Sequence, residues 1–296
     1  MGKARDQRAR PRRRRLSRRR WLWICGGGAA AAVAGIAVGN DAGRLTITRM
    51  ELRPPGLGRD LDGFTIAHLT DLHRGLYTPA AFIAHAVAET NALRPDLIVL
   101  TGDYVTRSAY YLASCAEALR ELSAPRGKLA VFGNHEHWTD LDVARRQLTA
   151  TAGCDLLQNE SITFMEGSAV LCIVGLDDPW TRHEDFGRAF ASVPKGAPTI
   201  LLSHTPDIAA EAASRSVDLV LCGHTHGGEV VLPWIGPPYV WARTGRRFGS
   251  GLNHEGTTAV YTNRGIGRGF LPFRLNCPPE IALFTLRAPQ EAGTHE

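Results

Sequence analysis

Short apolar runs recur along the chain from about residue 44 onward, and most of them end in Gly, Asp, Asn or His. They are rich in Val, Ile and Leu and have the length of buried strands, at 64–70, 96–100, 128–132, 169–175, 199–203, 218–222, 229–233, 257–263 and 280–286. Between several runs, apolar residues recur at three- and four-residue spacing among helix formers, at 79–92, 109–122, 140–150 and 206–214. The pattern predicts strands that alternate with helices.

Buried strands that alternate with helices indicate an α/β fold in which helices cover the faces of the sheets. The C-terminal runs have less helix between them, which favours an antiparallel portion there. No long linker, internal repeat or low-complexity stretch interrupts residues 41–296. We therefore predict a single domain over that range.

Acids, imidazoles and one amide follow five of the predicted strands. In open α/β sheets, functional groups gather beyond the carboxyl ends of the strands. Seven of these side chains are candidate metal ligands: Asp71, His73, Asp103, Asn134, His204, His224 and His226. Carboxylates and neutral imidazoles bind Mn, Fe and Zn, and the lack of cysteine in the set argues against a structural zinc cluster. Seven ligands suit two ions that share a carboxylate, which predicts hydrolysis at phosphorus.

Each of these residues also has an ordinary explanation when taken alone. Asp or Asn beside Gly is more commonly a turn residue, and the Asp177 and Asp178 pair is interpreted as a turn that has a smaller chance of lining the site. The other histidines match none of the strand-end blocks and are interpreted as ordinary side chains: His68, His85, His137, His183, His254 and His295. The joint occurrence of all five blocks favours the metal site.

The ordered blocks TDLHRG, LTGDYV, FGNHEHW, LLSHTP and CGHTHGG resemble the calcineurin-like metallophosphoesterase superfamily. The tail TNRGIGRGFLPFRLNCPPEIALFTL narrows the resemblance to the bacterial exported or membrane-associated phosphodiesterase branch. The likeness covers about residues 44–287. It implies a four-layer α/β/β/α sandwich with a dinuclear metal site at the carboxyl ends of the strands.

The resemblance also implies a role for each ligand candidate. The first ion would be held by Asp71, His73, Asp103 and His226, and the second by Asp103, Asn134, His204 and His224. Asp103 would bridge the two ions together with a water or hydroxide. His135 would stabilise the phosphoryl oxygens or protonate the leaving oxygen. Glu229 stands where this family leads us to expect Gln, which puts only substrate contacts in question.

The charge is divided unevenly along the chain. Residues 1–20 hold Lys3 and ten arginines against Asp6, a formal charge of +10, so the rest of the chain carries −5 of the total of +5. Residues 21–38 then run for eighteen positions without a charge. Ser17-Arg18-Arg19-Arg20-Trp21-Leu22 resembles the twin-arginine export motif, with Trp where Phe is usual. We predict that residues 1–40 are an export signal or a membrane anchor, which places the domain on the extracytoplasmic face.

Three arginines and two apolar stretches near the C-terminus are the sequence features that bear on substrate and partners. Arg264, Arg268 and Arg274 suit phosphate groups, or are solvated loop charges. The apolar stretches 233–242 and 269–273 fit contact with a bilayer surface or a lipid tail, and equally core packing. No aromatic and basic pattern of the kind that binds single-stranded nucleic acid is present. The six cysteines form no CxxC pair and are interpreted as mostly buried thiols.

These observations predict a phosphodiesterase or pyrophosphatase with two divalent ions, Mn, Fe or Zn, acting on an envelope lipid or a nucleotide-derived compound. A nuclease or nucleotidase that uses the same residues is the alternative within enzymes. A catalytically idle, metal-stabilised surface protein is the alternative outside them, and the intact ligand set with His135 argues against it.

Overall fold

The computed structural model describes residues 41–289, and these build two six-stranded sheets. The first sheet has, in spatial order, β1 (Thr46–Leu52), β12 (Glu280–Leu286), β2 (Thr65–Leu69), β3 (Leu97–Thr101), β4 (Lys128–Val131) and β5 (Asp155–Leu156). The second has β10 (Gly251–Glu255), β11 (Thr258–Thr262), β9 (Leu219–Cys222), β8 (Thr199–Leu202), β7 (Ala169–Gly175) and β6 (Glu160–Glu166).

Most neighbouring strands run parallel. β2 to β5 are parallel in the first sheet, and β7, β8, β9 and β11 are parallel in the second. β12 lies antiparallel to β2, and β10 lies antiparallel to β11. The antiparallel portion predicted for the C-terminal runs is therefore confirmed.

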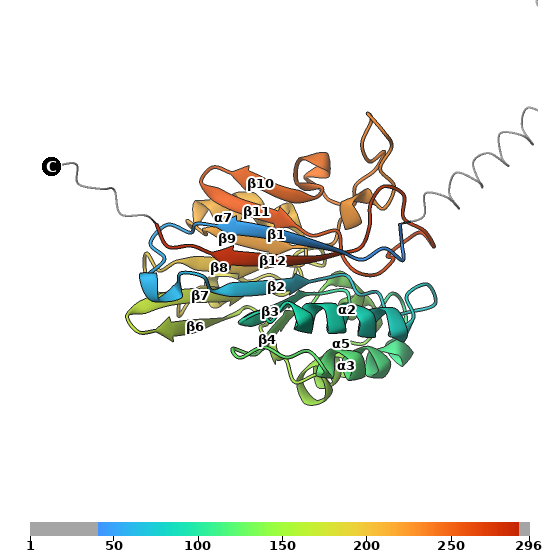
Figure 1. The fold of residues 1–296 in the computed structure, drawn as a ribbon, viewed down its shortest axis with the longest axis horizontal. Coiled ribbons are helices and arrows are strands. Elements are labelled where there is room, and N and C mark those ends of the chain that lie inside the picture. The colour runs from blue at the N-terminus through green and yellow to red at the C-terminus, as the bar shows by residue number, and fades with distance from the viewer. Residues whose placement is uncertain (1–40, 290–296) are drawn as a thin grey trace, which may run out of the picture. The chain divides into compact units, whose positions relative to one another are not determined.

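The helices lie on the outer faces of the sheets. They are α2 (Ala80–Ala92), α3 (Leu112–Arg120), α4 (Asn134–Thr139), α5 (Leu141–Arg146), α6 (Phe186–Ala189) and α7 (Ala209–Ser214). Shorter helical turns span Arg59–Leu61, Ala109–Tyr111, Gln147–Thr151, Pro206–Ile208, His226–Gly228 and Gly245–Phe248. Figure 1 shows α2, α3 and α5 along β2, β3 and β4, and α7 beside β9 and β11.

Alternation along β3 shows how the layers form. Leu97 and Val99 point into the core between the two sheets, where they join residues of β7, β8 and β9. Ile98 and Leu100 point the other way, into the core shared with α2 and α3. A third core joins the outer face of the second sheet to α7. Strands buried on both faces read as continuous apolar runs, and the predicted α/β/β/α sandwich is confirmed.

One predicted strand is wrong. The run 229–233 forms only single bridges, from Val230 to Leu275 and from Leu232 to Gly236. Its first residue, Glu229, has a φ of 57°, which an extended strand does not allow. The chain turns here because the Glu229 carboxylate binds the backbone of a neighbouring loop.

The loops after the two sheets meet at one edge of the sandwich. The amide of Ile266, in the loop after β11, donates to the carbonyl of Thr70 at 3.0 Å, and that of Gly267 donates to Asp71 at 2.7 Å. Asn263 Nδ2 donates to the His68 carbonyl at 3.1 Å. These bonds hold the carboxyl end of β2 against that of β11.

Within residues 41–289, none of the helices combines the length and apolar character that a bilayer crossing requires. The predicted signal or anchor at 1–40 lies outside the described residues.

Candidate metal centre

The seven predicted ligands converge from loops that follow β2, β3, β4, β8 and β9. All of them are buried, and five have a positive φ: Asp71, His73, Asp103, His224 and His226. A positive φ at a non-glycine residue costs of order 1–3 kcal/mol. Such residues are concentrated at functional sites, where the surrounding structure enforces the conformation. Asp and His are among the side chains that tolerate this conformation best.

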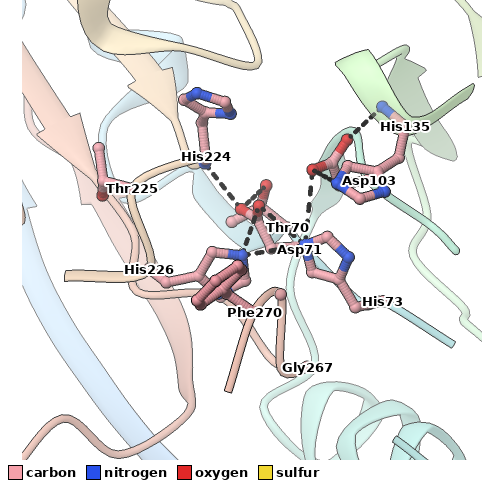
Figure 2. A network of polar contacts seen from close by, with 12 residues as sticks. Thr70, Asp71, His73, Asp103, His135, His224, Thr225, His226, Gly267 and Phe270 are labelled. Atoms are coloured by element: carbon pink, nitrogen blue, oxygen red, sulfur yellow. Dashed lines mark hydrogen bonds and ion pairs between the residues drawn. The ribbon is translucent and has the colours of Figure 1, made fainter. Parts of the chain in front are cut away.

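Asp71, His73 and His226 form the first group of candidate ligands. Asp71 Oδ1 lies 3.3 Å from His226 Nε2 and 3.7 Å from His73 Nε2, and the two imidazole nitrogens are 2.9 Å apart. The other carboxylate oxygen of Asp71 accepts from the Thr70 hydroxyl and from the amide of His224. Figure 2 shows Asp71 between the two histidines of the His224–His226 turn and His73.

Asp103, His204 and His224 form the second group, and Asn134 lies beside them. His204 Nε2 is 3.2 Å from Asp103 Oδ2, 3.1 Å from Asn134 Oδ1 and 3.1 Å from His224 Nδ1. Asp103 Oδ2 also lies 3.5 Å from His73 Nε2, so this oxygen faces both groups. The geometry therefore brings together the residues predicted for each ion, with Asp103 between them.

Hydrogen bonds fix which atoms face the site. His204 Nδ1 lies 2.7 Å from the Thr101 carbonyl, and since a carbonyl only accepts, Nδ1 carries a proton and Nε2 is the nitrogen that faces the other candidate ligands. Asp71 Oδ1 is buried and has no hydrogen-bond partner among the described residues. A ring of lone pairs with an unsatisfied carboxylate oxygen fits divalent cations, and histidine ligands are commonly oriented by such carbonyl bonds.

The protonation of the site follows from this crowding. Burial opposes charge on Asp71 and Asp103, but the surrounding histidines hold the pKa of both carboxyls well below the usual range. Burial lowers the pKa of His73 to about 4 and that of His224 to about 3. His204 is buried as well, yet Asp103 raises its pKa well above the usual value. The two carboxylates, His73 and His224 therefore have the protonation states that divalent metals require, whereas His204 would give up a proton when a cation binds.

Glycines of the motifs let the backbone approach the ligands. A Cβ on Gly133 would lie 2.4 Å from Asp103 Oδ1, and one on Gly223 would lie 2.1 Å from Asp71 Oδ2. Neither glycine has a positive φ, so close approach is the reason that a side chain is excluded here.

His135 lies at the edge of the site, next to Asp103. Its amide donates to Asp103 Oδ1 at 3.0 Å, and its ring Nδ1 contacts the Thr106 carbonyl. That contact places the proton on Nδ1 and turns Nε2 toward Asp103 Oδ2, at 3.8 Å. His135 thus presents one ring nitrogen to the space beside the ligands, as its predicted role requires.

Glu136 is a site residue that the sequence analysis did not single out. Its buried carboxylate accepts from the amides of Asp103, Tyr104 and Gly133, each at 2.9 Å. Burial and the nearby Asp103 raise the pKa of Glu136 to about 8. The Glu136 bonds fix the loop that presents Asp103. The sequence feature that could have identified Glu136 is its position as an acidic residue inside the FGNHEHW block.

The remaining sequence candidates have structural roles. His68 lies inside the sandwich and binds the Thr101 hydroxyl, and His137 binds Asp177 and stacks on His183. Asp178 accepts from the amides of Trp180 and Thr181, which confirms the predicted turn. The five described cysteines are buried thiols, as predicted: Cys115, Cys154, Cys172, Cys222 and Cys277.

The three tail arginines differ from one another. Arg274 is fully buried and donates to the carbonyls of Gly267 and Cys277, and its Nη2 lies 3.0 Å from His226 Nδ1. Arg264 pairs with Glu280. Both are therefore bound within the fold, and Arg274 is not the solvated loop charge of the alternative. Arg268 is half-buried, and its amide donates to Thr78.

A cavity of about 380 Å³ opens onto the ligand groups. His73, Asp103, Asn134, His135, His224 and His226 contribute to its floor, and aromatic side chains form its walls: Trp138, Trp180, Trp241 and Phe270. Arg107 also lines it. The cavity is large enough for a phosphoester with an apolar substituent.

Comparisons with known proteins agree with this geometry. The calcineurin-like phosphoesterase family matches residues 64–228. The chain is 31% identical to the metallophosphoesterase YkuE of Bacillus subtilis over 93% of this chain and 99% of that one, and 31% identical to phosphodiesterase YaeI of Escherichia coli over 75% and 82%. It is 28% identical to UDP-2,3-diacylglucosamine pyrophosphatase LpxG of Chlamydia muridarum over 81% and 88%. The chain belongs to the calcineurin-like metallophosphoesterases, hydrolases that act on phosphoester bonds.

Proposed function

We propose that the protein is a two-metal phosphodiesterase or pyrophosphatase. The observation that carries this proposal is Asp103 Oδ2, which faces His73 Nε2 at 3.5 Å in one group of ligands and His204 Nε2 at 3.2 Å in the other. Two divalent cations held by these groups would supply Lewis acidity toward the phosphoryl oxygens and would lower the pKa of a nearby water. Mn, Fe and Zn all accept this donor set.

The chain's own residues supply the rest of the chemistry. The carboxylates of Asp71 and Asp103 and the imidazoles of His73, His204, His224 and His226 would hold the cations, with Asn134 Oδ1 beside the second group. His135 with a second ring proton on Nε2, beside the one on Nδ1, would donate it to the leaving oxygen or stabilise the phosphoryl oxygens. The Trp and Phe walls of the cavity exclude water from the reacting phosphate.

An envelope lipid or a nucleotide-derived compound is the substrate class that we propose. Two relatives support it, since YaeI is named a phosphodiesterase and LpxG a pyrophosphatase of a diacylated nucleotide sugar. We further propose that residues 1–40 export the domain or anchor it on the extracytoplasmic face, with the twin-arginine machinery as the route. The arginine run and the uncharged stretch 21–38 support this.

The test is hydrolysis of bis(p-nitrophenyl) phosphate by the manganese-loaded full chain. We expect Asp103→Asn to lose both bound metal and activity, because both groups share this carboxylate. We expect His135→Ala to retain metal by elemental analysis but to lose about 10²–10⁴-fold in rate. His85→Ala, on the exposed face of α2, is the matched control. An unchanged rate in His135→Ala, or no hydrolysis by metal-loaded protein, would refute the proposal.

A further inference from the structure

Large apolar side chains are exposed mainly at the edge of the sandwich that carries the metal centre. Among the described residues, nine of the eleven exposed large hydrophobics lie in segments that follow strands of the site, and only Met165 and Leu252 lie elsewhere, in β6 and β10. Three of the nine line the cavity, Trp138, Trp241 and Phe270, and three more belong to the same loop as Trp241: Trp234, Ile235 and Tyr239. We call these six residues the mouth face.

The mouth face is continuous with the wall of the cavity. The rings of Tyr239 and Trp241 are 4.8 Å apart, those of Trp241 and Phe270 are 5.5 Å apart, and both Trp241 and Phe270 line the cavity. The loop after β9 projects away from the sheets, in orange in Figure 1. A bridge between Leu232 and Gly236 closes its tip, which leaves Trp234 fully exposed and Ile235 63% exposed.

The charged residues within this loop are all basic, and two carboxylates outside it bind its carboxyl-terminal part: Glu255 pairs with Arg247 at 2.7 Å, and Asp207 accepts from the amide of Arg243 at 3.1 Å. Residues 233–250 contain Arg243, Arg246 and Arg247 and no Asp or Glu, and all three arginines are exposed. Arg246 Nη1 donates to the Ile235 carbonyl at 3.2 Å, so a guanidinium lies directly on the tip. Tryptophan and tyrosine with adjacent arginines are typical of surfaces that enter the headgroup region of anionic membranes.

The entry of the chain into the domain lies at the same edge. β1 is parallel to β12, and β12 is antiparallel to β2, so the amino end of β1 lies at the edge where β2 ends. The Asp41 amide donates to the carbonyl of Arg274 at 2.9 Å, and Arg274 contacts His226 of the site. Asp41, the first residue that the structure describes, therefore lies beside the loop that contacts the metal centre.

We propose that the mouth face docks on an anionic phospholipid bilayer, with Trp234 and Ile235 in the headgroup boundary. The cavity then opens onto the membrane and takes the phosphate of an amphiphilic ester whose apolar part stays in the bilayer. The inference rests on the proposed function for the reaction, but the docking itself does not require turnover.

The experiment follows a fluorophore at the tip of the loop in the full chain. Trp234→Cys is made together with Cys25→Ser and labelled with an environment-sensitive dye, because the five described cysteines are buried. The matched control is Met165→Cys in the same background. Met165 pairs with Val170 near the amino end of β7, at the opposite edge from the site, and is 66% exposed. Both proteins are mixed with vesicles of phosphatidylglycerol or of phosphatidylcholine.

With phosphatidylglycerol vesicles, we expect the emission of the dye at position 234 to shift to the blue and spin-labelled lipid to quench this emission. We expect no shift for the dye at position 165. Phosphatidylcholine or high salt is expected to weaken the shift at 234, because anionic headgroups attract the arginines. The proposal is overturned if position 234 stays in water while the protein sediments with vesicles. It is also overturned if the shift needs no lipid and grows with protein concentration, which would indicate self-association.

Hydrolysis of the soluble diester is measured on the same samples. Because Trp234 lies outside the cavity lining, Trp234→Ser with Ile235→Ser should leave that rate unchanged. Docking with no hydrolysis would count against the proposed function alone, and hydrolysis with no docking would count against this inference alone.

Discussion

At the scale of single residues, Glu229 shows what a departure from the expected family sequence does. Glu229 Oε1 accepts from the amides of Gly269 and Phe270, and Oε2 accepts from that of Leu271 at 2.9 Å. Burial opposes its charge, but His226 and these amides lower the pKa of Glu229 below its usual value. The carboxylate therefore holds the backbone that carries the Phe270 wall of the cavity.

Glu229→Gln tests this positioning role. The amide offers one acceptor oxygen and one donor group, so one of the bonded N–H groups loses its acceptor at a cost of about 1–3 kcal/mol. We expect a lower Tm and a higher KM for the soluble diester, with kcat retained, since the ligands are untouched. Steady-state kinetics and thermal unfolding check both effects. A large fall in kcat at constant KM would instead place Glu229 on the reacting groups.

At the scale of elements, the sequence predicted the strands in the middle of the sheets and not those at their edges. β1, β5, β6 and β10 were all missed, and they are the four edge strands. β6 has only exposed and half-buried positions, whereas every position of β3 is buried. An edge strand thus lacks the continuous apolar run that identifies a strand covered on both faces.

The candidate site was predicted more completely than the edges, for a physical reason. The motif blocks follow the central strands, which the apolar runs identify. Because metal ligands gather at the carboxyl ends of such strands, the side chains found there could be recognised as a ligand set. Supporting contacts from Glu136 to the amides of Asp103 and Tyr104, and from Arg274 to His226, join segments remote in sequence, and periodicity carries no signal for them. His135, in a motif block, could be identified, whereas the partners of Arg274 could not.

Arg274 fixes the loop beneath the metal centre, and Arg274→Met tests that element. The variant keeps much of the volume but removes the donors to the carbonyls of Gly267 and Cys277, which costs about 1–3 kcal/mol for each buried acceptor left unpaired. We expect a clear drop in Tm and weaker metal retention. Arg188→Met, which removes an exposed pair with Glu160, should change stability by about 0.5 kcal/mol or less. Equal Tm values for the two variants would contradict this role.

At the scale of the whole molecule, the buried histidines make the stability of the chain depend on pH. Burial lowers the pKa of His68 to about 3, whereas the unfolded chain keeps a value of about 6.5. Between these values the unfolded state binds a proton that the folded state does not. His68 therefore lowers the free energy of unfolding as the pH falls, by up to about 1.4 kcal/mol for each pH unit.

His68→Gln isolates this contribution, because glutamine does not titrate and can bond the Thr101 hydroxyl that His68 Nε2 contacts at 2.8 Å. His73 and His224 have lowered pKa values with the same sign, but they are present in both proteins and cancel in the difference. We expect the wild-type free energy of unfolding to fall more steeply than that of the variant from pH 6.5 to pH 4. Urea unfolding in chelator at several pH values measures both slopes. Because the comparison uses slopes, a uniform loss of stability in the variant does not affect it, whereas parallel curves would show that His68 is not held neutral by the fold.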